Sequence, residues 1–445
     1  MLKNKKMVQI RGNNGVLDHT ESLCPLCLKV IDARIVNQEG AVYLKKVCPD
    51  HGPATTYLWP NADHYQWMKA FRLPFEQPQT EIPARHGCPQ DCGLCTSHLR
   101  HTTLVEIEVT QRCNLHCPVC FIAAGGAPAD PALETLNGML EAVRRQADSQ
   151  VSIQLTGGEP TVRSDLAEIV GLSRQAGFSA IEVNTNGVVI GRSPRYIQQL
   201  AEAGISGIYL QFDGLTEQVY EKIRKADLLQ DKLRAIENCR AAGVQVVLAM
   251  TVIWGVNHDQ IGRILEFAFQ NQDVIAGVAY QPAFNSGRFD VTFEKRLTMG
   301  DVIFMLAEQS GGLIEPYDLW PLGTSHPLCS SATYIVEDCG VKKPFTRLIT
   351  RQEYIRAFDA HSPQGSVFAD IAARHSPAIG PGLSVVVMNY MDAMSMDIKR
   401  LQECSMTVTM EDGRLIPFCA YQVTNLYGKR LYPTWGRQLA PAEEQ

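Results

Sequence analysis

The sequence predicts an α/β fold: a parallel sheet in the middle of the chain, a small metal-binding module before it and a cysteine-bearing region after it. From about residue 104, runs rich in β-branched residues alternate six times with amphipathic helical stretches, the pattern of strands connected by crossover helices. Two cysteine triplets with the same spacing lie around the start of this alternation, and two shorter cysteine motifs lie near the N-terminus. The 445 residues are 45% hydrophobic and 20% charged, which is ordinary for a globular protein with more than one module.

Residues 1–60 are predicted to form a rubredoxin-like metal knuckle. Cys24 and Cys27 lie in CPLC, and Cys48 and His51 lie in CPDHG. Two such chelating pairs are typical of a tetrahedral site for one zinc or iron ion, and four protein ligands make the site structural. The stretch ARIVNQEGAVYLKKV between the pairs predicts a hairpin that turns at QEG. The alternative is that His51 is only a turn residue and another group is the fourth ligand.

Two cysteine triplets share one spacing, with three residues and then two residues between the thiols. They are Cys88, Cys92 and Cys95 in an auxiliary segment of residues 61–103, and Cys113, Cys117 and Cys120 in the segment that follows. Three close thiolates can hold three corners of a [4Fe–4S] cluster and leave the fourth iron open. Each triplet is therefore predicted to bind a cluster.

Residues 104–290 place their polar loops at one end of the predicted sheet. The Cys113 triplet follows the strand LVEIEVT, and TGGEP, NTNG, QFDG and YQPAF follow or end later strands. In parallel folds the loops after the strands form the active site, so these loops should converge on one mouth. Six units are too few for a complete eight-fold barrel, which leaves a partial barrel or an open doubly wound sheet.

Residues 291–445 are irregular and are expected to form a C-terminal auxiliary-cluster domain. Four dispersed cysteines are the candidate ligands: Cys329, Cys339, Cys404 and Cys419. The turn EDGR predicts that the last two flank a hairpin. The alternative is that these cysteines are buried structural thiols.

Charge and hydropathy exclude some functions. The net charge of −6 gives no bulk attraction to nucleic acid. The longest apolar runs, such as LSVVVMNYM, are too short to span a bilayer, and the start of the chain lacks the apolar segment of a signal peptide. We therefore expect a cytoplasmic protein, in which 14 cysteines indicate metal binding more than disulfides.

The motif CNLHCPVCF, followed after the next strand by TGGEPT, resembles the radical S-adenosylmethionine (SAM) superfamily over residues 104 to about 290. The resemblance implies a partial (β/α)6 TIM-like barrel in which the Cys113 triplet binds a catalytic [4Fe–4S] cluster and SAM binds its open iron. It also implies cofactor contacts from Phe121, Gly157, Gly158, Glu159, Asn186, Asp213, Val252 and Asn257. The plainer alternatives are that GGE is only a turn, and that Asn186 and Asp213 only cap a turn and a helix.

The order of all the cysteine motifs resembles a narrower group, the archaeal tetraether lipid synthases and the class D radical SAM methylases. That group implies three [4Fe–4S] clusters, one mononuclear zinc or iron site, and formation of a carbon–carbon bond. One position departs from the group: Thr324 stands where a cysteine commonly precedes the SHP segment. Cys339, or an open iron, would then complete the C-terminal cluster.

The expected reaction is reductive cleavage of SAM to a 5′-deoxyadenosyl radical, removal of a substrate hydrogen and carbon–carbon bond formation. The substrate is expected to be a small molecule or a lipid, and a lipid would bring peripheral membrane contact. The electron is expected from a reductant such as ferredoxin or flavodoxin. The alternatives are a multi-cluster radical SAM peptide maturase and a non-catalytic electron-transfer protein.

Overall fold

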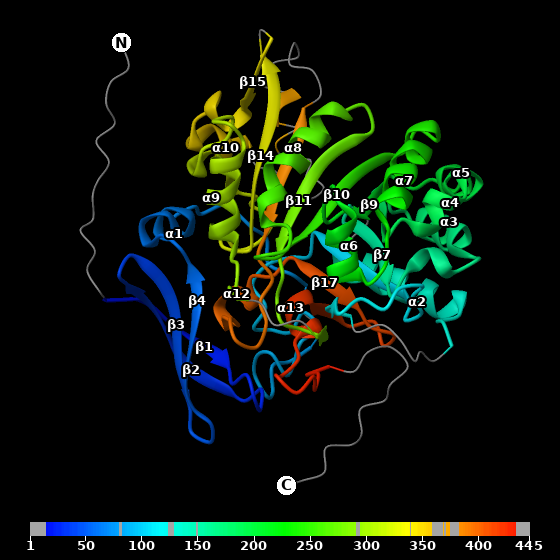
Figure 1. Ribbon diagram of the computed structural model, residues 1–445. Helices are drawn as coiled ribbons and strands as arrows, with labels where there is room; N and C mark the ends of the chain where they lie inside the picture. The colour runs from blue at the N-terminus through cyan, green and yellow to red at the C-terminus, as the bar shows by residue number, and fades with distance from the viewer. Residues whose placement is uncertain are drawn as a thin grey trace.

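The alternating strands and helices of the central region form one parallel sheet with helices on its outer face (Figure 1). The computed structural model describes residues 15–79, 82–122, 129–147, 150–290, 294–338, 340–357, 368, 371–373 and 382–432. Six neighbouring strands follow the chain order and pair in parallel: β5 (Leu104–Thr110), β7 (Ser152–Gly157), β8 (Ile181–Thr185), β9 (Gly207–Gln211), β10 (Gln245–Val252) and β11 (Ile275–Pro282). The predicted partial (β/α)6 barrel is confirmed.

Apolar periodicity explains why the helices lie on the outer face. The outward residues of β5 are Val105, Ile107 and Val109, and they join the main core with the buried faces of the helices. The helices are α2 (Leu133–Ala147), α3 (Leu166–Gln175), α4 (Val188–Arg192), α5 (Pro194–Ala203), α6 (Glu217–Arg224), α7 (Leu229–Ala241), α8 (Ile261–Gln270) and α9 (Met299–Gln309). Because side chains alternate along a strand, the other face of β5 is left for a cavity.

The C-terminal region extends this sheet at both edges and does not form a sheet of its own. Strand β16 (Leu383–Met388) pairs in parallel with β11, and β17 (Met406–Thr409) pairs in parallel with β5. Further strands continue the sheet in antiparallel fashion: β13 (Trp320–Pro321), β14 (Ser330–Asp338), β15 (Val341–Pro344) and β18 (Leu415–Pro417). The predicted hairpin at EDGR is confirmed by β17 and β18. Short helices α10 (Arg351–Ala357), α12 (Ile398–Gln402) and α13 (Phe418–Gln422) complete the region.

The N-terminal module is a separate antiparallel sheet. Its strands β1 (Gly15–Leu23), β2 (Val30–Gln38), β3 (Ala41–Cys48) and β4 (Gly52–Trp59) pair in chain order, and α1 (Ala62–Lys69) follows them. The predicted hairpin is confirmed: β2 and β3 are joined at Glu39 and Gly40, whose φ angles of 55° and 87° are left-handed. Such angles suit a tight two-residue turn.

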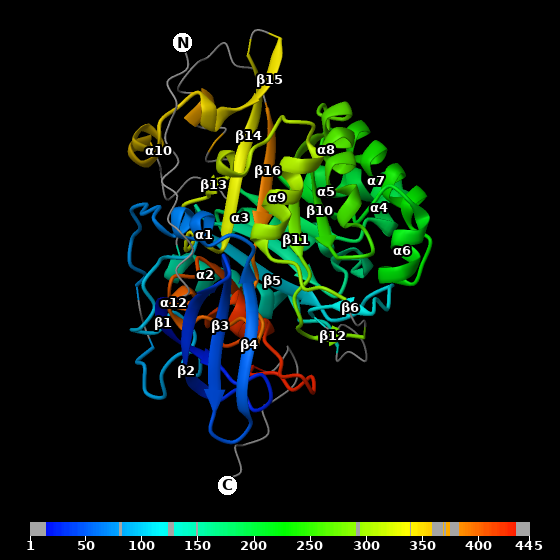
Figure 2. The same cartoon turned by 60° about the vertical axis from the view of Figure 1, so that its left-hand side comes forward.

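A buried lysine fixes this module to the C-terminal region. The Lys46 ammonium, 3% exposed, donates to the carbonyl oxygens of Leu23 (2.7 Å), Ala393 (2.8 Å) and Met394 (2.9 Å). Burial lowers the pKa of Lys46 to about 8. Figure 2 shows the blue N-terminal strands lying against the orange C-terminal segment that carries these acceptors.

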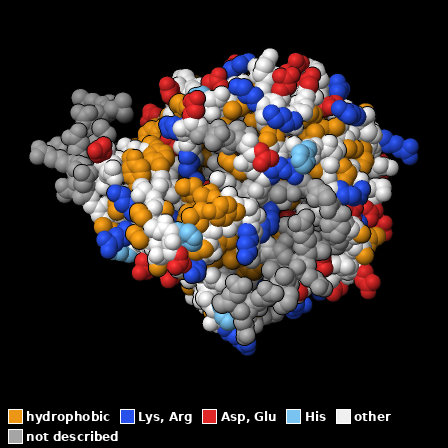
Figure 3. All heavy atoms as spheres, turned by 60° about the horizontal axis from the view of Figure 1, so that its bottom comes forward, with side chains coloured by type: hydrophobic (Ala, Val, Ile, Leu, Met, Phe, Trp, Pro, Cys, Tyr) orange, Lys and Arg blue, Asp and Glu red, His pale blue; other side chains and the backbone are white. Residues whose placement is uncertain are grey.

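The surface of the described part shows mixed charge. On the face drawn in Figure 3, acidic and basic side chains are interspersed, and apolar side chains gather in limited groups between them. Among the residues that the structure places, no helix is both long and apolar enough to cross a membrane.

We predict that Lys46→Met lowers the free energy of unfolding by on the order of 3 kcal/mol, because it leaves buried carbonyl acceptors without a donor. Urea denaturation followed by tryptophan fluorescence measures the change. The matched control is Lys45→Met, one residue earlier on β3. That lysine is exposed, and its ammonium group donates to the Gln38 side chain. Equal midpoints for the two variants would show that the buried ammonium does not fix the module.

Candidate active site and metal centres

A cavity of about 560 Å³ lies on the inner face of the parallel sheet. Its wall includes all three thiols of the second triplet, Cys113, Cys117 and Cys120. The loop residues Gly157, Gly158, Glu159 and Asn186 also line it, and Phe121 does so beside Phe284. The loops after β5, β7 and β8 therefore converge on one cavity, as their places after parallel strands predict.

The second triplet lies in the loop after β5, and two contacts hold that loop. The short strand β6 (Val119–Cys120) pairs with β12 (Arg288–Phe289), and the Arg288 guanidinium donates to the Cys117 carbonyl (3.1 Å). Burial raises the pKa of the Cys113 thiol to about 12, and the neighbouring Glu159, Cys117 and Cys120 act in the same direction. Iron binding replaces such thiol protons. Three neighbouring thiols on one cavity wall fit a [4Fe–4S] cluster with an open corner.

The GGE loop packs directly on the cysteine loop. A Cβ at Gly158 would lie 2.2 Å from the Arg112 carbonyl oxygen, and Gly157 has a φ of 126°. The Gly158 amide donates to the Thr110 carbonyl (2.8 Å), and the Glu159 amide donates to the Arg112 carbonyl (2.8 Å). Only glycine allows this approach, so GGE is more than a plain turn.

Glu159 joins the loop after β7 to the loop after β8 through its carboxylate. It accepts hydrogen bonds from Thr161, from the Thr185 hydroxyl (2.6 Å) and from the Asn186 amide N–H (2.7 Å). The Asn186 side chain in turn donates to Asn114 (2.7 Å) in the cysteine loop and accepts from the Val188 amide (3.0 Å). Asn186 therefore caps a turn and also lines the cavity, and its contact with a cofactor stays a prediction.

Three of the predicted cofactor contacts do not face the cavity: Asp213, Val252 and Asn257 are each 0% exposed and are not part of its wall. The side-chain oxygen of Asn257 accepts a hydrogen bond from the Ile253 N–H (2.8 Å). Its side-chain nitrogen donates to the carbonyl oxygens of Asp213 and Thr251, each at 2.8 Å. The side chain of Val252 belongs to the main core. These three residues are therefore packing residues outside the cavity wall.

Sequence reasoning missed the partner of Asp213. Both oxygens of Asp213 accept from the Arg224 guanidinium, at 2.8 and 3.0 Å. Burial raises the pKa of the Cys117 thiol, and the adjacent Arg224 opposes that shift. Asp213 thus holds a cation against a cluster ligand. Lys232 is buried nearby, donates to Gln211 (2.9 Å) and to the Asn186 carbonyl, and has its pKa lowered by burial to about 7.

The thiols of the first triplet, Cys88, Cys92 and Cys95, also lie close together. A hydrogen bond with Cys88 and burial raise the pKa of Cys92 well above its usual value, and Cys95 adds to the shift. The Tyr432 hydroxyl accepts from the Cys92 N–H (3.0 Å), so the C-terminal region closes over this loop.

The C-terminal thiols come together as a third set. Burial and the neighbouring Cys329 raise the pKa of the Cys404 thiol to about 12. Burial and the neighbouring Cys404 raise the pKa of the Cys419 thiol. The Arg400 guanidinium lies 3.3 Å from the Cys329 sulfur. Thr324 is buried and its hydroxyl has no hydrogen-bond partner within the described part of the chain.

The fourth ligand of this set stays a prediction, because Cys339 lies outside the described residues. The third set adjoins the first triplet, because the His98 Nε2 lies 2.8 Å from the Cys404 carbonyl oxygen. Cys239, in contrast, lies on α7 and is a fully buried thiol of the main core.

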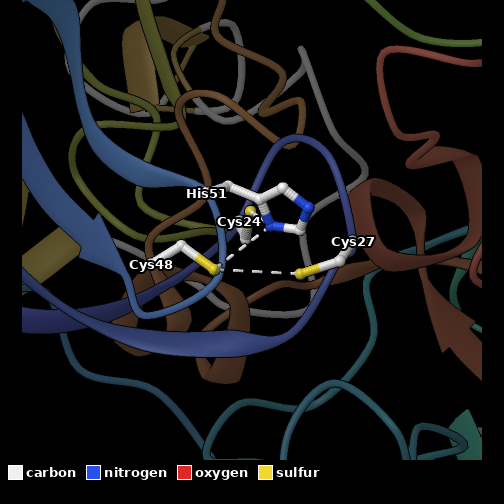
Figure 4. Close-up of side chains that lie close together, drawn as sticks. All are labelled: Cys24, Cys27, Cys48 and His51. Atoms are coloured by element: carbon white, nitrogen blue, oxygen red, sulfur yellow. Dashed lines mark hydrogen bonds between the residues drawn. The ribbon is translucent and has the colours of Figure 1, made fainter.

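The N-terminal motifs form a four-ligand group. Cys24, Cys27, Cys48 and His51 point toward one another in Figure 4, and their ligand atoms all lie within 4.8 Å of one another. The His51 Nδ1 lies 3.4 Å from the Cys48 sulfur and 3.6 Å from the Cys24 sulfur. These spacings suit a tetrahedral zinc or iron ion, so His51 is placed as a ligand and not only as a turn residue.

The fold and the open cysteine triplet define a radical SAM enzyme, and sequence comparison agrees. The radical SAM superfamily model matches residues 107–268, and a model described as the HMPTM N-terminal zinc ribbon domain matches residues 16–60. The chain is 33% identical to the 7,8-dihydro-6-hydroxymethylpterin dimethyltransferase of Methanocaldococcus jannaschii, over 90% of this chain and 92% of that relative. The chain belongs to the family of that dimethyltransferase.

More distant similarities cover about half of the chain or less. The probable GTP 3′,8-cyclase of Methanothermobacter marburgensis is 31% identical over 40% of this chain and 58% of its own length. Among solved structures, Streptococcus suis SuiB bound to precursor peptide SuiA is 15% identical, covers 47% of this chain and 46% of its own, and has a TM-score of 0.41.

We predict that Cys48→Ser removes the N-terminal metal ion and lowers the melting temperature, because metal binding is coupled to the folding of small modules. Elemental analysis of zinc and iron, with thermal melting, measures both effects. Cys239→Ser, a change at a thiol away from the four ligands, should keep the full metal content. A Cys48→Ser protein with unchanged zinc and iron would argue against the site.

The double change Cys404→Ala with Cys419→Ala is predicted to remove about four irons per chain, the content of one cubane cluster. The Cys113 set should still support formation of 5′-deoxyadenosine, because its thiols lie in a different loop. Iron analysis and anaerobic assay measure the two effects, and Cys239→Ala is the matched control. Wild-type iron content in the double variant would identify these thiols as packing residues.

Proposed function

We propose that this chain is a radical SAM methyltransferase that forms a carbon–carbon bond on a dihydropterin. The observation that carries the proposal is the extent of the similarity to the pterin dimethyltransferase, which covers 90% of this chain. The similarity to the probable GTP 3′,8-cyclase covers 40% of this chain, and a shared fold by itself does not specify a substrate.

The residues of the site would have the following roles. Cys113, Cys117 and Cys120 would hold the catalytic cluster, and the GGE loop would lie against the bound SAM. When bound, the cluster and SAM supply a 5′-deoxyadenosyl radical that removes a substrate hydrogen atom. Phe121 packs with Phe284 and Phe418 on the cavity wall, and these rings would exclude water from the reacting atoms.

The other cysteine sets are proposed to bind two accessory [4Fe–4S] clusters. Contact between the His98 ring and Cys404 would place those clusters close enough to exchange electrons. A ferredoxin or flavodoxin would supply the first electron, and a folate-type methylene donor would supply the new carbon. The zinc ribbon has a structural part in this scheme.

A polar part of the cavity wall favours a polar substrate over a lipid chain. It carries the acidic side chains of Glu106 and Glu182 and the amides of Gln154, Asn184 and Gln281. The Glu106 Oε2 and the Asn184 Oδ1 have no partner within the described residues, and packing hydrocarbon against them would leave both acceptors unsatisfied, at a cost of about 1–3 kcal/mol for each. Lipid coupling is therefore less well supported, and the extent of the similarity to the pterin dimethyltransferase disfavours peptide maturation.

Anaerobic turnover tests the proposal. The holoenzyme is mixed with SAM, a reductant, a methylene donor and either 7,8-dihydro-6-hydroxymethylpterin or archaeal lipid, and products are measured by mass spectrometry. We predict methylated pterin together with 5′-deoxyadenosine, and neither product from the variant with all three of Cys113, Cys117 and Cys120 changed to alanine. Coupled lipid chains with unchanged pterin would overturn the proposal.

A further inference from the structure

A row of hydrogen-bonding side chains crosses the cavity wall below the cysteine loop. Glu106 on β5 is in register with Gln154 on β7, and Gln154 is in register with Glu182 on β8. All three line the cavity, together with Asn184. The Gln154 amide donates to Glu182 (2.8 Å) and accepts from Asn184 (3.1 Å), so the row is ordered before any ligand arrives.

Within the described part of the chain, no salt bridge joins a cation to the carboxylates of this row. Arg224 is the only basic side chain that the described cavity wall contains, and it is committed to Asp213. Glu106 is 3% exposed, and its Oε2 has no hydrogen-bond partner within the described part of the chain. The Asn184 Oδ1 is also without one.

Burial, and then repulsion from Glu108, raises the pKa of Glu106 to about 8. Burial also raises the pKa of Glu182, and the hydrogen bond from Gln154 opposes that shift. An unpaired buried acceptor is costly to keep. Its presence on a cavity wall points to a ligand that brings N–H donors.

We propose that Glu106 binds the 2-amino-4-oxopyrimidine edge of the substrate, with Glu182 and Asn184 as adjoining acceptors. This edge presents a ring N–H and an amino N–H side by side, which match the two oxygens of one carboxylate. The inference rests on the proposed function and names the residues that would select its substrate.

Two tyrosines give the row an aromatic border. Burial, with the charges of Glu182 and Glu106, raises the pKa of Tyr209. Burial, with the neighbouring Tyr209 and Glu106, raises the pKa of Tyr390. Both rings line the cavity, and aromatic faces suit a flat heterocycle.

The row also orients the ligand. Glu106 lies four residues before the end of β5, about 13 Å of extended strand, and the cysteine loop begins beyond that end. A ligand held by its pyrimidine edge would therefore direct its second ring toward the radical site.

Guanine has the same edge, so a guanine nucleotide is the competing source of this chemistry. A triphosphate needs cationic partners, and the described wall offers only the committed Arg224. The observations therefore favour the pterin, and GTP becomes one arm of the test.

The experiment is anaerobic calorimetry on the metal-loaded enzyme with SAM. The probes are 7,8-dihydro-6-hydroxymethylpterin, its analogue with oxygen in place of the 2-amino group, guanosine and GTP. We expect wild-type enzyme to prefer the pterin over the 2-oxo analogue. Glu106→Gln should weaken pterin binding by about ten- to one-hundred-fold and remove most of that preference, and Glu182→Gln should have a smaller effect in the same direction.

The matched control is Glu108→Gln, two residues along the same strand. Its side chain is not part of the cavity wall, and its Oε2 accepts from Tyr421 (2.8 Å) and Gln111 (2.6 Å), so pterin affinity should stay within about twofold of wild type. Iron content and formation of 5′-deoxyadenosine without substrate verify that each variant is folded. The analogue comparison on wild-type enzyme needs no variant.

The outcomes separate the two proposals. Pterin binding that both Glu106→Gln and Glu182→Gln leave unchanged, in affinity and in preference, would overturn this inference and leave the proposed function standing. GTP binding tighter than pterin binding would overturn the choice of pterin. Failure of wild-type enzyme to bind the pterin at all would overturn the proposed function, and this inference with it.

Discussion

The contact between the loop after β5 and the loop after β7 determines the geometry of the active site. Gly158 lies so close to the Arg112 carbonyl that no side chain fits between them. That approach brings Glu159 under the cysteine loop, where its carboxylate connects to Thr185 and Asn186 on the next loop. The mouth of the cavity is thus a hydrogen-bonded unit, and the cluster ligands are held by neighbouring loops and not by their own loop alone.

Local patterns were sufficient to predict the six parallel strands, the N-terminal hairpin and the places of the thiols. Val105, Ile107 and Val109 reveal one face of β5 by their spacing, and CPLC with CPDHG reveals a chelating group. The pairing of Asp213 with Arg224 was not predictable in this way, because it depends on how α6 packs against the cysteine loop. Sequence reasoning assigned Asp213 to a cofactor contact because it follows a strand, yet its side chain is fully buried and is not part of the cavity wall.

The same limit applies to Glu106. In the sequence it is one polar residue inside a strand, and nothing in the pattern LVEIEVT distinguishes it from Glu108. The structure separates the two: Glu106 lines the cavity, whereas Glu108 does not, and the Glu108 Oε2 accepts from Tyr421 and Gln111. Two other buried charges are compensated, Asp213 by Arg224 and Lys46 by carbonyl oxygens. An uncompensated carboxylate is therefore informative, because burial without a partner is costly.

The edge strands β16 and β17 have a consequence for how the chain reaches its folded state. β5 begins at Leu104, and its outer neighbour β17 begins at Met406, so one edge of the sheet stays unpaired until the chain has been synthesised past Met406. Contacts between such distant segments form slowly, because a long loop must close first. An uncovered parallel edge is also prone to pair with other chains. The C-terminal region thus covers the edge of the barrel only after β17 has been synthesised. Before β17 pairs with β5, the nascent enzyme is most prone to aggregation.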